Sequence, residues 1–269
     1  MMHWTTIGRA LSILVITLIM AGCVSRESDD GSSSGDQVVI TVAAASDLIP
    51  AFEEIGERFN EETDYEVEFT FGSSGLLAQQ VEAGAPIDVY VSANEAYVDE
   101  LNAQGLLIEE TVQAYALGRI VIWSLDEEIG TLPDVSSLDS PQISRIAIGN
   151  PDHAPYGVAG REALQSAGVW DKVQDKLVLG SNIRETLQYA ESGNVDVAIV
   201  ALSLALAIDE GHWTLIPKEE HEPIVQTLGI VASTDNEDAA RTFVEFVMND
   251  EGRSTLSNYG FEFPDGGDS

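Results

Sequence analysis

The chain has 269 residues, 44% of them apolar, which is enough to build one large domain or two medium-sized domains with real cores. Its charge is unusual: 46 Asp and Glu residues stand against 12 Lys and Arg residues, and the formal net charge is -34. A nucleic-acid-binding function is excluded, because phosphate backbones require a cluster of basic side chains that this sequence lacks.

The acidic residues are spread along the whole chain instead of gathering in one tail. Such a surface stays hydrated in concentrated salt, and at about 1 M salt the Debye length of about 3 Å screens the repulsion between its carboxylates. We therefore interpret the composition as halophilic. The alternative is an acidic protein that works in dilute salt.

The first 22 residues have the pattern of an export signal. One basic residue, Arg9, precedes an apolar run from Ala10 to Met20. This run of 11 residues is too short for a membrane span, which needs about 20, so we predict a signal peptide over residues 1–22.

Small residues precede Cys23, and this pattern resembles the lipobox at which exported lipoproteins are cut and lipidated on the new N-terminal cysteine. Residues 24–37 are polar and rich in Ser, Gly and Asp, so residues 23–37 are predicted to be a lipidated cysteine with a flexible tether. The alternative is an unused thiol near an ordinary cleavage site. Cys23 is the only cysteine, which excludes an intrachain disulfide.

From residue 38 onward, short β-branched runs alternate with amphipathic stretches, which predicts an α/β protein with mixed, mainly parallel sheets. Strands are expected at 38–44, 66–71, 87–92, 118–124, 145–149, 176–180, 195–201 and 223–233. Helices are expected from Leu48, over about 75–83, 94–104, 157–167, 184–192 and 203–209, from about 239, and near 251.

Two of the expected strands, 118–124 and 223–233, look like crossings between two lobes. Lobe 1 is expected to comprise residues 38–117 and 228–269, and lobe 2 to comprise residues 118–227 with the crossings. Two lobes joined by two crossings form a hinged cleft that can close on a ligand.

Five loops that connect strand ends to helix starts carry small or hydroxyl residues. In open α/β folds such loops meet at the carboxyl edge of the sheet, where ligands bind. Helix N-termini present unpaired N–H groups, so several of them directed at one cleft form an oxyanion site without a cationic side chain. Ser and Asn are also ordinary helix caps, so no single loop is enough to predict an oxyanion site. The loops are 44–46, 72–75, 155–157, 181–183 and 201–203.

Several longer segments resemble, in order and spacing, the molybdate-binding proteins of ABC importers. They are TVAAASDL, FTFGSSGLLAQQVEAGAPIDVYVSAN, IAIGNPDHAPYGVAGREALQSAGVW, NIRETL, VDVAIVA and NYGF. The resemblance covers nearly all of residues 38–263. It implies the two-lobed type II periplasmic-binding-protein fold, with a tetrahedral oxyanion held between the lobes by neutral donors.

The resemblance also implies which residues bind the oxyanion. Ser46 and Ser74 would donate from hydroxyl and backbone groups, and Tyr156 and Ile183 from backbone N–H groups. Molybdate would thus be bound as the oxyanion, through its oxygen atoms. Ala201 departs from the family, which often has a Tyr hydroxyl there, so we expect Tyr156 or Ser203 to supply the missing hydroxyl. Ser73 is a possible extra donor.

A fully deprotonated oxyanion only accepts hydrogen bonds, so the groups that face it should be donors. Asp47 follows Ser46 and leaves a phosphate receptor as an alternative. Phosphate retains a proton, so it can donate a hydrogen bond to a carboxylate. We expect the Asp47 side chain to point to solvent from the first turn of a helix.

The sequence favours a binding protein over an enzyme. It lacks the GxSxG of a Ser hydrolase and the Lys of a phosphate-binding P-loop, and its histidines have no metal-ligand spacing. We predict a monomeric, lipid-anchored extracytoplasmic receptor for molybdate or tungstate, without a cofactor, that delivers its ligand to an ABC permease. The alternatives are a sulfate or phosphate receptor and a non-binding surface sensor.

Overall fold

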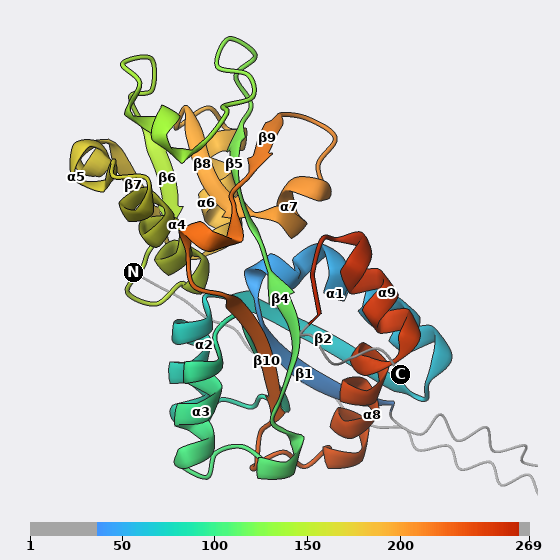
Figure 1. Ribbon diagram of the computed structural model, residues 1–269. Helices are drawn as coiled ribbons and strands as arrows, with labels where there is room; N and C mark the ends of the chain where they lie inside the picture. The colour runs from blue at the N-terminus through green and yellow to red at the C-terminus, as the bar shows by residue number, and fades with distance from the viewer. Residues whose placement is uncertain (1–36, 264–269) are drawn as a thin grey trace, which may run out of the picture. The chain divides into compact units, whose positions relative to one another are not determined.

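Two five-stranded sheets organise the computed structural model, which describes residues 37–263 (Figure 1). The predicted signal peptide, the predicted lipidation at Cys23 and all but the last residue of the predicted tether lie outside the described residues. Within residues 37–263, no helix is long and apolar enough to cross a membrane.

The first sheet has the strand order β2-β1-β3-β10-β4, and β1 pairs in parallel with both β2 and β3. β10 runs antiparallel to β3 and to β4. The strands are β1 (Val38–Ala45), β2 (Tyr65–Gly72), β3 (Val89–Ser92), β4 (Gln113–Gly118) and β10 (Ile224–Ile230).

The second sheet repeats this plan with the order β7-β6-β8-β5-β9. β6 pairs in parallel with β7 and β8, and β5 pairs antiparallel with β8 and β9. The strands are β5 (Ile120–Ser124), β6 (Ile146–Gly149), β7 (Leu177–Gly180), β8 (Val197–Ala201) and β9 (His212–Leu215). The prediction of an α/β protein with mixed sheets is confirmed, but the sheets are not mainly parallel, because each has two parallel and two antiparallel pairings.

The helices flank the sheets (Figure 1). The α-helices are α1 (Ile49–Glu62), α2 (Ser74–Glu82), α3 (Glu95–Ala103), α4 (Pro155–Ser166), α5 (Trp170–Val173), α6 (Ile183–Glu191), α7 (Leu202–Leu206), α8 (Glu237–Met248) and α9 (Asp250–Asn258). The 3-10 helices are η1 (Ser46–Leu48), η2 (Glu109–Thr111), η3 (Val135–Asp139), η4 (Gln174–Lys176) and η5 (Lys218–Glu220).

Aromatic packing attaches α8 to α1 and, through Phe69, to β2 of the first sheet. Phe52 and Phe59 lie on the buried face of α1, and Phe243 of α8 packs edge-on against both rings, with centroids 6.0 and 5.4 Å away. Such edge-to-face pairs add to the stabilisation that burial of the rings provides. The C-terminal part of the described residues therefore returns to the sheet in which they begin.

The chain crosses between the sheets at Arg119, where the sequence predicted one continuous strand over 118–124. β4 ends at Gly118 in the first sheet, and β5 begins at Ile120 in the second. The expected lobe boundary at 227/228 falls inside β10, all of which pairs within the first sheet. The sequence pattern missed β4, β9 and α5; β9 and α5 have only four residues each.

Candidate functional site

A small pocket lies between the carboxyl ends of strands from both sheets and the helices that follow them. Its cavity volume is about 10 Å³, roughly the space of one water molecule. Ligand pockets for drug-sized molecules measure roughly 300–1,000 Å³, so this one is too small for an organic solute. Its lining consists of Ala45, Ser46, Asp47, Gly72, Ser73, Ser74, Ala93, Ala154, Pro155, Tyr156 and Ile183.

Five of the predicted site residues line this one pocket, although they come from four separate segments of the sequence: Ser46, Ser73, Ser74, Tyr156 and Ile183. Ser74 and Ile183 are the first residues of α2 and α6, and Tyr156 is the second residue of α4. The first N–H groups of a helix have no partner within it, and the helix dipole makes this end partly positive. The pocket thus gathers three helix N-termini.

Ser74 presents a free hydroxyl proton to the pocket. Its Oγ accepts a hydrogen bond from the backbone N–H of Ala93 at 3.0 Å, and its carbonyl accepts one from the Tyr90 hydroxyl at 2.8 Å. These two contacts fix the residue and use only acceptor capacity. The hydroxyl of Ser74 can therefore donate to an anion.

Ser46 joins the two sheets across the pocket. Its hydroxyl donates to Asn182 Oδ1 at 3.3 Å, and its oxygen accepts from the backbone N–H of Arg184 at 3.4 Å. Both bonds are long compared with the usual 2.7–3.2 Å, so a better acceptor can replace them at little cost. Asn182 is the cap of α6, and its Oδ1 also accepts from Glu185 N–H at 2.9 Å.

Ser73 contacts His153 from the opposite side of the pocket. Its hydroxyl lies 2.9 Å from His153 Nδ1 and also contacts the carbonyl of the same residue, to which Gly75 N–H donates at 3.0 Å. These bonds connect the start of α2 with the loop before α4. Ser73 and His153 therefore help to hold the two sheets together.

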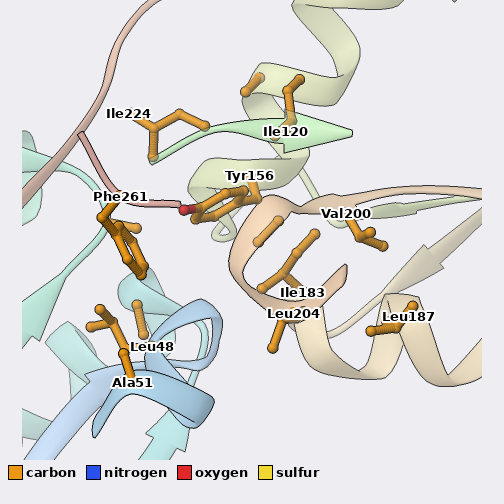
Figure 2. Packing of buried hydrophobic residues seen from close by; sticks show 14 of the residues in the cluster. Leu48, Ala51, Ile120, Tyr156, Ile183, Leu187, Val200, Leu204, Ile224 and Phe261 are labelled. Carbon is orange, nitrogen blue, oxygen red and sulfur yellow. The ribbon is translucent and has the colours of Figure 1, made fainter. Parts of the chain in front are cut away.

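Tyr156 is placed by a close approach between α4 and the end of β6. A Cβ atom on Gly157 would lie 2.1 Å from the carbonyl oxygen of Gly149, so only glycine fits there. The Tyr156 side chain extends into the buried cluster that contains Ile120, Ile183 and Phe261 (Figure 2). Its backbone N–H is at the pocket, and its ring is core.

The hydroxyls of Tyr156 and Ser203 are both engaged with Asp47. The Tyr156 hydroxyl donates to Asp47 Oδ2 at 2.8 Å, and the Ser203 hydroxyl donates to the backbone carbonyl of Asp47 at 2.7 Å. Ala201 is fully buried at the end of β8. Neither Ala201 nor Ser203 is among the residues that line the pocket.

The expectation that Asp47 points to solvent is wrong. Its exposed fraction is 0%, because η1 turns the side chain inward between the sheets. Oδ2 also accepts a hydrogen bond from Gln226 Nε2 of β10 at 2.7 Å, whereas Oδ1 has no partner among the described residues. Burial raises the pKa of Asp47 to about 6, and its hydrogen bonds with Tyr156 and Gln226 only partly offset that rise.

The pocket therefore combines neutral donors with one buried carboxyl. No Lys, Arg or His is among the residues that line it. In the part of the chain that the structure describes, no group of His, Cys, Asp and Glu is arranged to hold a metal ion. The neutral donors and helix N-termini of this lining are suited to hold an anion by hydrogen bonds and helix dipoles.

Comparison with known proteins agrees with this geometry. The family model of bacterial extracellular solute-binding proteins matches residues 40–262. The chain belongs to this family.

Its relatives include proteins named for molybdate. The chain is 30% identical over 223 residues to the molybdate-binding protein ModA of Rhodobacter capsulatus, covering 83% of this chain and 87% of the relative. It is 32% identical to the Bacillus subtilis protein named "Putative ABC transporter substrate-binding lipoprotein YvgL", covering 93% of this chain and 96% of that protein.

The solved periplasmic molybdate-binding protein of Azotobacter vinelandii matches the fold with a TM-score of 0.79 and 29% identity, covering 84% of this chain and 99% of that one. The resemblance to molybdate-binding proteins and the two-lobed solute-binding fold are thus confirmed. The relatives are binding proteins, in agreement with the expectation that the family member described here is not an enzyme.

The sequence did not identify the partners of Asp47. Gln226 is a polar residue in the middle of the apolar run PIVQTLGIV, and this was a usable signal for a buried polar contact. Tyr115 of β4 is also buried, and the electrostatic influence of Asp47 contributes to its raised pKa, after burial itself. No sequence pattern distinguished Tyr115 from an ordinary core residue.

Proposed function

We propose that this family member is a lipid-anchored extracytoplasmic receptor that binds molybdate or tungstate and delivers it to an ABC permease. The observation that carries the proposal is the gathering of three helix N-termini and the Ser46 and Ser74 hydroxyls around one small pocket. The relatives named for molybdate support this choice of anion. In this proposal Ser46, Ser74, Tyr156 and Ile183 donate hydrogen bonds to the anion.

The two sheets would act as the lobes of a hinged receptor. The chain crosses between them at Arg119 and again before Ile224, which supports a hinge formed by these two crossings. Selectivity against sulfate would follow from size, because both anions need the same donors and only the larger one reaches both lobes. The permease would recognise the closed form through the rims of both lobes.

The test of this proposal is thermal unfolding of the purified protein in 2 M KCl with molybdate, tungstate, sulfate or phosphate. A ligand at about a thousand times its Kd stabilises the folded state by roughly 4 kcal/mol. We expect molybdate and tungstate to raise the Tm and sulfate to have little effect. A shift with sulfate alone would reassign the ligand, and no shift with any anion would refute a receptor function.

Asp47 favours a second candidate ligand. A buried carboxylate in the pocket wall can accept a hydrogen bond from an anion that carries its own proton, such as hydrogen phosphate. This candidate predicts the largest shift with phosphate in the same experiment.

The net charge of -34 should make the stability depend strongly on salt. The seven ion pairs among the described residues use only five cationic side chains, so most carboxylates lack a positive partner there. Raising KCl from 0.1 M to 2 M should stabilise the fold by about 2 kcal/mol, or roughly 4–8 °C in Tm. Sorbitol at equal osmolality is the control, and an equal rise with sorbitol would contradict the screening argument.

A further inference from the structure

The pocket presents an electrostatic conflict at Asp47. A fully deprotonated oxyanion accepts hydrogen bonds only, so each group that faces it should donate one. Asp47 lines the same pocket and, when ionised, is itself an anion and an acceptor. An ionised Asp47 beside a bound dianion in a buried site is strongly unfavourable, because repulsion between like charges is much stronger in a buried site than in bulk water.

The surroundings of Asp47 offer no positive charge to resolve the conflict. Tyr156 of α4 and Gln226 of β10 donate to its Oδ2, and Ser203 of α7 donates to its backbone carbonyl. Tyr115 of β4 is the other titratable group that faces it, and burial raises the pKa of both tyrosines well above the usual value, so both stay neutral.

Arg184, the cationic residue at the start of α6, forms an ion pair with a different carboxylate. The guanidinium of Arg184 pairs with Glu191 at 2.9 Å, and only its backbone N–H approaches the pocket, at Ser46. Among residues 37–263, no Lys, Arg or His makes an ion pair or hydrogen bond with Asp47. Protonation is thus the way in which this carboxyl can lose its charge.

We propose that Asp47 is a specificity residue of this pocket that takes up one proton from solvent when the oxyanion binds, and that it is then a neutral carboxylic acid beside the anion. The inference rests on the proposed function. Oδ1 is the oxygen that receives the proton, because Oδ2 already accepts two hydrogen bonds and Oδ1 accepts none from the described residues. The protonated carboxyl makes the pocket lining uniformly neutral.

The contacts of Asp47 also link proton uptake to closure of the two lobes. Asp47 follows β1 of the first sheet, and its partners Tyr156 and Ser203 belong to helices that flank the second. With the lobes apart these two bonds are broken and the carboxyl is hydrated, which favours its charged form. Burial already raises its pKa to about 6 in the closed arrangement, and a dianion beside it raises the pKa further. Anion binding, closure and proton uptake therefore favour one another.

The experiment is calorimetric titration of the purified protein with molybdate in 2 M KCl, at pH 6.5 to 8, in two buffers that differ in ionisation heat. At pH 7.5 we expect uptake of about one proton per anion, and a Kd that rises at least about tenfold from pH 6.5 to pH 8. Asp47→Asn keeps the size of the side chain and removes the titration. It should bind molybdate with no proton uptake and with less than a twofold change in Kd over this range.

A second variant separates this role from a structural one. Tyr156→Phe removes a donor that stabilises the charged carboxylate, so the midpoint of the pH dependence should move to higher pH while proton uptake persists. Binding of molybdate without proton uptake, or an equal pH dependence in Asp47→Asn, would overturn the inference while leaving the receptor function intact. Preferential binding of hydrogen phosphate without proton uptake would also overturn it, since Asp47 would then act as an ionised acceptor.

Failure of the proposed function has a different signature. In that case neither the wild type nor Asp47→Asn would release heat with molybdate, tungstate, sulfate or phosphate. This result would overturn both proposals together. Circular dichroism of each variant at the same pH values shows whether the fold is intact.

Discussion

Gly157→Ala should lower the free energy of unfolding by about 3 kcal/mol, or roughly 6–12 °C in Tm, and weaken anion binding at least tenfold. The new Cβ would lie 2.1 Å from the carbonyl oxygen and 2.5 Å from the carbonyl carbon of Gly149. Both are backbone atoms, so either the end of β6 or the start of α4 must move. That movement displaces the backbone N–H of Tyr156 from the pocket.

Gly160→Ala is a matched control in the same helix, one turn further on. Its Cβ would meet Ile199 at 3.5 Å, an ordinary contact, and alanine is the better helix former by about 1 kcal/mol. This variant should be slightly more stable than the wild type and bind with unchanged affinity. Equal stabilities for the two variants, measured by chemical unfolding in 2 M KCl, would show that the close approach at Gly157 is not what fixes α4.

Much of the fold could be predicted because local patterns and tertiary packing agree. Leu48, Phe52, Ile55 and Phe59 recur at helical spacing, and all four are buried. The misses occur where local sequence does not carry the information. The apolar run 118–124 is equally consistent with one strand or with two strands in different sheets, and only the pairing of β4 with β10 and of β5 with β8 divides it.

The residues of the pocket were predictable as a set, because each follows a strand end and the family resemblance ordered them. Their partners were less predictable. A carboxylate in a first helical turn normally faces solvent, where the helix dipole favours it. Asp47 differs because α6 and α7, which follow strands of the second sheet, pack against η1, and no pattern near residue 47 encodes that contact. The expectation that the Tyr156 hydroxyl binds the anion likewise left out Asp47. In the structure this hydroxyl donates its hydrogen bond to the buried Asp47 carboxylate.

Ser74→Ala should weaken molybdate binding by roughly 10- to 150-fold, because a hydrogen bond to a charged group contributes about 1.5–3 kcal/mol. The Ser74 hydroxyl is buried, lines the pocket and has its proton available, since Oγ only accepts from Ala93 N–H. The substitution also leaves that N–H without its acceptor and should cost about 1 kcal/mol of stability. Calorimetric titration measures the first effect, and unfolding of the free protein measures the second.

Ser92→Ala separates these two effects. The Ser92 hydroxyl is fully buried in the neighbouring turn, donates to the Asn94 carbonyl at 2.7 Å and accepts from Asn94 N–H at 3.1 Å, but it does not line the pocket. Its loss should therefore cost a similar amount of stability and leave the Kd within about twofold of the wild type. If both variants lose affinity equally, the effect of Ser74 arises from the 92–94 turn, and the donor that binds the anion must be sought among the backbone N–H groups of α2, α4 and α6.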